Sequence, residues 1–164
     1  MMYTTNAHDA FLGRTANIEY DNAVQYAGVL VRDEGDTKDI LPGMVVKHIG
    51  DKQMKLYDGT GTPFGLAAIF VAPNYGRGGI NQLGQNGEFT AIVGNNTTTV
   101  RINVDALDQA SSFAVKADGT KVPVYANADG RISMTGTVVI GHLLEVAPDN
   151  KSIVIQLADP AVAA

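Results

Sequence analysis

The sequence contains no cysteine, no tryptophan and only three histidines. Without cysteine the chain has no disulfides, no thiolate metal ligands and no thiol nucleophile. No apolar run approaches the roughly 20 residues that a membrane-spanning helix needs. The opening residues, MMYTTNAHDAFLG, also lack the layout of a signal peptide. We therefore expect a soluble protein that is made in a reducing compartment and that has no membrane partner.

Acidic residues outnumber basic ones, and the formal net charge is −5. This balance is opposite to that of a nucleic-acid-binding surface, so we expect no nucleic-acid partner. The chain has 164 residues, of which 45% are hydrophobic and 18 are glycine. Such a composition predicts one domain with a sizeable core, built from many short strands that are joined by tight turns.

The pattern along the chain divides it into an arm, a β body and a tail. Residues 1–23 have no sustained periodicity and are predicted to form a flexible N-terminal arm. Residues 24–158 alternate short β-rich runs with turns, which predicts a β-barrel-like domain, with 74–88 as a polar loop. Residues 159–164 are predicted to be a C-terminal tail. The fold class is therefore mainly β, a small barrel-like or β-tulip domain with at most one short helix, which begins with Asp105 as its N-cap.

Two runs in the middle of the chain predict a hairpin. FTAIVG and TVRINVD bracket the polar residues NNTT, and asparagine tolerates the left-handed backbone of a tight turn. In the second run Val100, Ile102 and Val104 alternate with polar residues, which predicts a strand with one buried face.

The segments 44–73 and 113–148 share an order of features. Each has an apolar-x-Val-Lys run, a strand that ends in tyrosine, an Asp-Gly turn, and a glycine that opens a long apolar strand. A chance likeness in a glycine-rich β protein is the alternative explanation. Two such units suit the corners of a small closed or half-closed barrel. The predicted corner residues are Asp58, Gly59, Gly65, Asp129, Gly130 and Gly141.

The sequence predicts no catalytic, cofactor-binding or metal-binding residue. His8, His48 and His142 have no spacing that places two nitrogens on one face, and the serines lack the local frame of a nucleophile. The segment YGRGGINQLG matches neither glycine-rich phosphate motif. Its GRGG, with Arg77, is superficially similar to a loop of the trimeric dUTPase-like nucleotide hydrolases. That family places the loop near its C-terminus and needs upstream motifs that this chain lacks.

The segment KLYDGTGTPFGLAAIFVAP, with LPGMVV before it, resembles the lambda-type head-decoration (capsid cement) proteins of tailed bacteriophages. The C-terminal VVIGHLLEVAPDNKSIVIQL is similar to the closing strands of broader phage cement proteins. The likeness lies in a lysine, an aromatic-Asp-Gly-Thr corner and a glycine that opens an apolar strand. The matching positions are Lys55, Tyr57, Asp58, Gly59, Thr60, Gly65, Leu66 and Ala67.

This resemblance implies a structural protein without enzymatic activity or cofactor. It implies a homotrimer on the outer capsid surface of the virion, with the major capsid protein as partner. The arm suits a segment that becomes ordered on the capsid. We expect its contacts to be Phe11, Leu12, Arg14, Ile18 and Tyr20. The alternatives are a different virion or surface binding module, such as a head-fibre base or a carbohydrate-binding domain, and a trimeric β-barrel nucleotide hydrolase.

Overall fold

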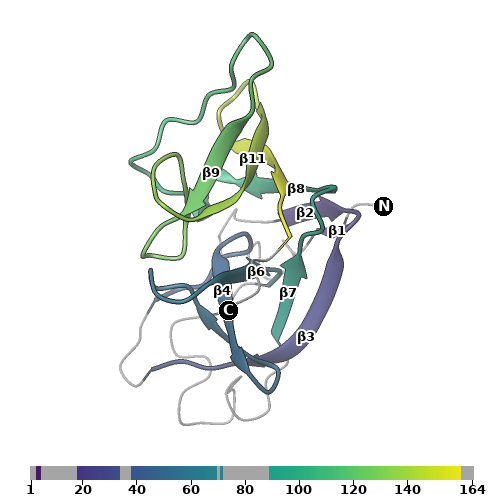
Figure 1. Ribbon diagram of the computed structural model, residues 1–164, viewed down its shortest axis with the longest axis vertical. Helices are drawn as coiled ribbons and strands as arrows, with labels where there is room; N and C mark the ends of the chain where they lie inside the picture. The colour runs from purple at the N-terminus through teal and green to yellow at the C-terminus, as the bar shows by residue number, and fades with distance from the viewer. Residues whose placement is uncertain (1–2, 5–17, 34–37, 70, 72–88, 160–164) are drawn as a thin grey trace.

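The chain folds into a closed barrel and an open sheet, which lie in the lower and upper halves of Figure 1. The structure is a computed structural model that describes residues 3–4, 18–33, 38–69, 71 and 89–159. This confirms the prediction of a mainly β protein with a barrel. No helix within these ranges is long and apolar enough to span a membrane.

Five strands close the barrel, in the order β3-β5-β4-β6-β7 and back to β3. Neighbouring strands are antiparallel except β3 and β5, which run parallel. Leu30, Met54 and Phe89 are fully buried. The strands are β3 (Val24–Leu30), β4 (Val45–Gly50), β5 (Gln53–Leu56), β6 (Pro63–Ala67) and β7 (Phe89–Val93).

The open sheet has seven strands in the order β1-β2-β8-β12-β11-β9-β10, and all its pairings are antiparallel. Strand β12 shows the alternation that a one-sided strand requires, because Ile153, Ile155 and Leu157 are buried between half-buried residues. The strands are β1 (Tyr3–Thr4), β2 (Ile18–Asp21), β8 (Thr98–Asn103), β9 (Val122–Ala126), β10 (Ile132–Ser133), β11 (Val139–Val146) and β12 (Ser152–Leu157).

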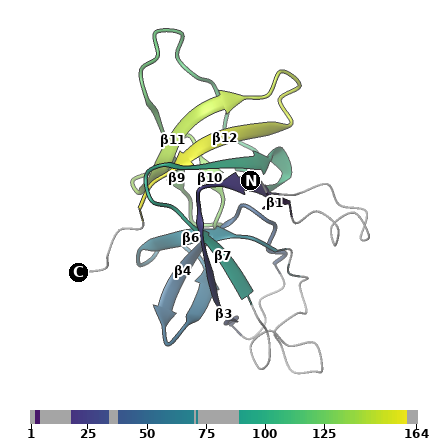
Figure 2. The same cartoon turned by 90° about the vertical axis from the view of Figure 1, so that its right-hand side faces the viewer.

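One continuous hydrophobic core joins the barrel to the sheet. A turn of the barrel segment carries Gly43, whose ideal Cβ would lie only 2.6 Å from Cγ2 of Ile102 in the sheet. Figure 2, turned by 90°, shows the same two parts stacked end to end. The shared core makes the junction between them a packed region.

The predicted hairpin at 89–105 is wrong. Asn96 does adopt the positive φ of a tight turn, at 67°. However, β7 before it closes the barrel, whereas β8 after it pairs with β2 and β12 in the open sheet. The turn is therefore a crossing from one part of the fold to the other. Alternation in β8 is as predicted, since Val100 and Ile102 are buried.

The short helix is a single 3-10 turn, η1 (Val104–Ala106), and its cap differs from the prediction. Asn103 is the N-cap, and its side-chain oxygen accepts a hydrogen bond of 3.0 Å from the backbone N–H of Asp105. Asp105 lies inside the first turn instead. Asparagine is as good an N-cap as aspartate, so residue type alone does not show whether Asn103 or Asp105 caps the turn.

Candidate functional site

The two Asp-Gly turns of the sequence face each other at the junction of barrel and sheet. The ideal Cβ of Gly59 would lie 3.1 Å from Cβ of Ala128, next to the second turn. Gly130, with φ of 73°, sits against Leu56, and its carbonyl accepts a 2.7 Å hydrogen bond from the backbone N–H of Val45. The two echoing segments thus meet in space, and their turns hold the two parts of the fold together.

Asp58 organises the first of these turns. Its Oδ1 accepts hydrogen bonds from Lys47 Nζ at 2.7 Å, from Thr60 Oγ1 at 2.6 Å and from the Thr60 backbone N–H at 3.0 Å. The hydrogen bond from Lys47, and then those from Thr60, hold the pKa of Asp58 well below its ordinary value. The carboxylate is therefore used to fix a corner.

Gly65 and Gly141 have the same packing environment in different sheets. An ideal Cβ on Gly65 would lie 2.5 Å from the carbonyl oxygen of Ile92, and one on Gly141 would lie 2.2 Å from that of Gln156. Each glycine also lies beside a register shift in its ladder. A bulge next to a close backbone approach needs glycine. The structure thus places these predicted corner residues, like Asp58, Gly59, Asp129 and Gly130, at turns or bulges.

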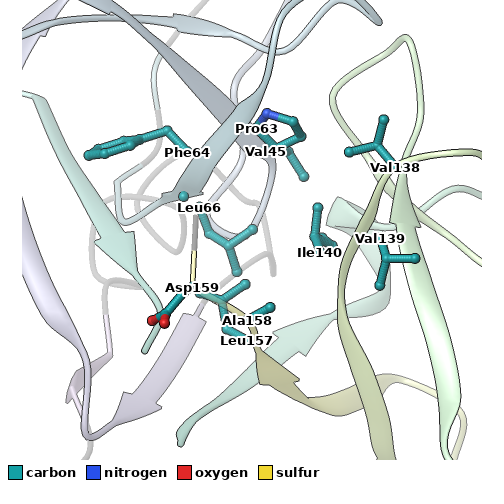
Figure 3. Close-up of a pocket in the computed structure, with 11 residues that line it drawn as sticks. Val45, Pro63, Phe64, Leu66, Val138, Val139, Ile140, Leu157, Ala158 and Asp159 are labelled. Atoms are coloured by element: carbon teal, nitrogen blue, oxygen red, sulfur yellow. The ribbon is translucent and has the colours of Figure 1, made fainter. Parts of the chain in front are cut away.

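An apolar groove runs between the barrel and the sheet, next to these bulges. The empty space in the groove is about 400 Å³, and this volume includes the part that is open to solvent. Figure 3 shows Val45, Pro63 and Leu66 from the barrel on one wall and Ile140 from β11 opposite them, with Asp159 at one end. The lining residues are Val45, Pro63, Phe64, Gly65, Leu66, Val138, Val139, Ile140, Leu157, Ala158 and Asp159.

Three rings on strands β3, β4 and β6 of the barrel pack together. The Phe64 ring points away from the groove in Figure 3. Its centroid lies 4.9 Å from that of the Tyr26 ring, and the two rings meet edge to face. The Tyr26 hydroxyl is 3.0 Å from His48 Nε2, at hydrogen-bond distance. Tyr26 and Phe64 are half-buried and His48 is exposed, so the three rings form a partly solvent-facing cluster.

A model of the phage cement protein family matches residues 2–164. The chain belongs to the phage cement protein family. The match covers nearly the whole sequence, so it includes both the barrel and the open sheet. Neither a curated protein nor a solved structure was found to match the chain.

Two of the five residues that we expected to contact the capsid are packed in the core of this cement protein. Ile18 is fully buried and Tyr20 is 6% exposed. Along β2 they lie opposite Ile102 and Val100 of β8, in two apolar rows that cross the sheet. Side chains packed in this way are not available to a partner surface in this conformation. The other three expected contacts, Phe11, Leu12 and Arg14, lie outside the described residues, as does the predicted polar loop 74–88.

Sequence reasoning missed both the groove and the ring cluster of the cement protein. Phe64 and Val139 are far apart in the chain, and no local pattern indicates that β6 and β11 lie across a groove from each other. Among the described residues, no group of three or more histidines and carboxylates lies close enough to hold a metal ion. His48 and His142 both lie in strands, and His8 is outside the described part.

Proposed function

We propose that this cement protein binds the outer surface of a phage head as a homotrimer, contacts the major capsid protein and stabilises the shell. The observation that carries the proposal is the family match over residues 2–164. A rigid β body with one continuous core suits such a role, because a protein that clamps neighbouring capsid subunits must resist deformation. In this proposal the chain is made in the host cytoplasm and has no enzymatic activity.

The segment before β2 is the proposed capsid contact. Phe11 and Leu12 supply apolar anchors and Arg14 supplies a charge, all within a stretch that precedes Ile18 by only a few residues. The burial of Ile18 and Tyr20 fits this role, because it fastens the root of the segment to the body. Three such segments on one trimer would bind with an avidity that a single segment lacks.

The family match favours this function over the two alternatives from the sequence. A head-fibre base or carbohydrate-binding module and a nucleotide hydrolase each require a binding site of their own chemistry. The GRGG run that prompted the hydrolase alternative is part of the polar loop 74–88, which lies outside the described residues. No observation in the described part of the chain favours either alternative over the cement function.

A sedimentation assay tests the proposal. Purified protein is mixed with expanded heads that lack their decoration protein, and the pelleted fraction is measured with increasing protein concentration. We expect saturable binding, and we expect decorated heads to resist heat or chelator better than naked heads. A protein that stays in the supernatant at all concentrations would contradict the proposed function.

A further inference from the structure

The groove between barrel and sheet is an apolar surface that the described residues of the chain leave uncovered. Its floor residues Val45, Leu66 and Leu157 are almost fully buried, but Val139 on its rim is 47% exposed. An apolar concavity at the junction of two parts of a fold is the usual form of a binding site. The groove therefore has the shape and chemistry to accept a small apolar side chain.

One end of the groove carries a fixed negative charge. Asp159 Oδ2 accepts a 2.8 Å hydrogen bond from Asn96 Nδ2, and the Asp159 backbone N–H donates to Asn96 Oδ1 at 2.9 Å. The Gln156 side chain also donates to the carbonyl of Asn96. This network holds the carboxylate at the mouth of the groove, so the complementary occupant is an apolar residue with a cation beside it.

The same chain presents such a pair on the connection from η1 to β9. Figures 1 and 2 show this loop projecting beyond the ends of β9 and β11. Residues 114–121 are all exposed, and Val115 is 49% exposed. Lys116 follows directly, and its carbonyl accepts a turn bond of 3.1 Å from the Gly119 backbone N–H. The tip therefore offers an exposed valine that is followed directly by an exposed lysine.

The base of this loop is held firmly. Asp108 Oδ2 accepts hydrogen bonds from Ser111 Oγ at 3.0 Å and from Ser133 Oγ at 2.9 Å. Arg131 Nη1 donates to the carbonyl of Leu107 at 3.1 Å. Burial alone would raise the pKa of Asp108, but the hydrogen bonds from the Ala110 backbone, Ser133 and Ser111 lower it. A loop that is fixed at its base presents its tip in a defined place.

We propose that the loop tip, residues 114–118, inserts into the groove of a second copy of this chain. Val115 fills the apolar part, and Lys116 pairs with Asp159 of that second copy. Loop tip and groove are different surfaces of one molecule, so the contact is head-to-tail and can close into a ring. The number of copies in that ring, three, rests on the proposed function, whereas the contact itself does not.

Sedimentation velocity and native mass spectrometry of the full chain test this contact without any capsid. We expect Val115→Asp and Val139→Asp each to weaken self-association by at least about tenfold. The matched control is Leu144→Asp, because Leu144 is 46% exposed but lies outside the groove, and we expect it to assemble like the wild type. Val115 lies on an exposed loop, so its variant tests the contact even if Val139→Asp fails to fold.

A charge exchange adds an independent test. Lys116→Glu and Asp159→Lys should each weaken assembly, and the double variant should recover it, because the pair is restored with its signs reversed. A wild type that stays monomeric, or Val115 and Lys116 variants that assemble normally, would overturn the proposal. Normal assembly with lost head binding would assign the loop to the capsid instead. Self-association without any head binding would contradict the proposed function and leave this contact standing.

Discussion

Lys47 Nζ lies 2.7 Å from Asp58 Oδ1, and this ion pair ties strand β4 to the turn that faces the open sheet. The Lys47 side chain is only 12% exposed, whereas that of Asp58 is 46% exposed. The pKa of Asp58 is lowered in the folded protein, first by the hydrogen bond from Lys47 and then by Thr60. Because its folded pKa lies below its unfolded pKa, the carboxylate contributes stability that is present above about pH 4 and is lost below it.

The first prediction concerns this pH dependence. Asp58→Asn should lower the melting temperature at pH 7, and the difference from the wild type should shrink as the pH falls from about 4 towards 2. Asp129→Asn is the control, because Asp129 is 71% exposed and its contact with Lys38 is 3.7 Å long. Such an exposed pair contributes little. A deficit for Asp58→Asn that is constant from pH 7 to pH 2 would contradict the role assigned to the ion pair.

Gly65 is predicted to be intolerant of any side chain. Gly65→Ala should destabilise the fold by about 3 kcal/mol, because its Cβ would press against the Ile92 carbonyl at 2.5 Å. Gly119→Ala is the matched control. Gly119 has φ of 77° and open space around it, so alanine there costs about 1 kcal/mol of backbone strain only. Urea denaturation measures both, and equal losses would show that the close approach at Gly65 does not matter.

Thr98 is predicted to stabilise the crossing between β7 and β8. Its hydroxyl is fully buried, donates to the carbonyl of Asn22 at 2.7 Å and accepts from the Asn95 backbone N–H at 3.2 Å. Thr98→Val should cost about 1–3 kcal/mol because both partners lose a hydrogen bond. Thr99→Val, on the half-buried face of the same strand, should be nearly neutral. A neutral Thr98→Val would show that these partners find other hydrogen bonds.

The residues of the N-terminal segment should separate into two classes. Ile18→Ala should lower the free energy of unfolding by about 2–5 kcal/mol, because Ile18 is fully buried in the row with Ile102. Phe11→Ala should leave stability unchanged and reduce binding to decoration-free heads. Thermal melts and sedimentation with heads measure the two effects. Loss of stability without loss of head binding in Phe11→Ala would contradict the proposed contact role.

The sequence predicted the parts of the fold that depend on local pattern. Alternation identified β8 and the buried face of Val100 and Ile102, and the corner chemistry of Asp58, Gly59 and Gly65 predicted a barrel. The pairing of the strands could not be predicted, because a strand shows the same alternation of buried and exposed residues whichever strand it pairs with. This is why 89–105 was predicted as a hairpin, although Asn96 turns the chain into a different sheet.

Similar limits explain the other differences. The FAVK run has the same pattern as MVVK, which enters strand β4, but residues 113–116 lie in the projecting loop. A four-residue run is too short to show whether it pairs in a sheet or stays in an exposed loop. The predicted arm includes Ile18 and Tyr20, because a strand of four residues is too short to show a period. Their partners Ile102 and Val100 lie about 80 residues away, so only the fold brings them together.

The proposed binding to the phage head is tested most directly by a cryo-electron microscopy reconstruction of decoration-free expanded heads after incubation with the purified protein. We predict added density on the outer surface in groups of three copies, with the barrel and open sheet resolved as two stacked parts. Heads that remain bare at saturating protein, or that carry only single separate copies, would contradict the proposal that this chain binds the head as a trimeric cement.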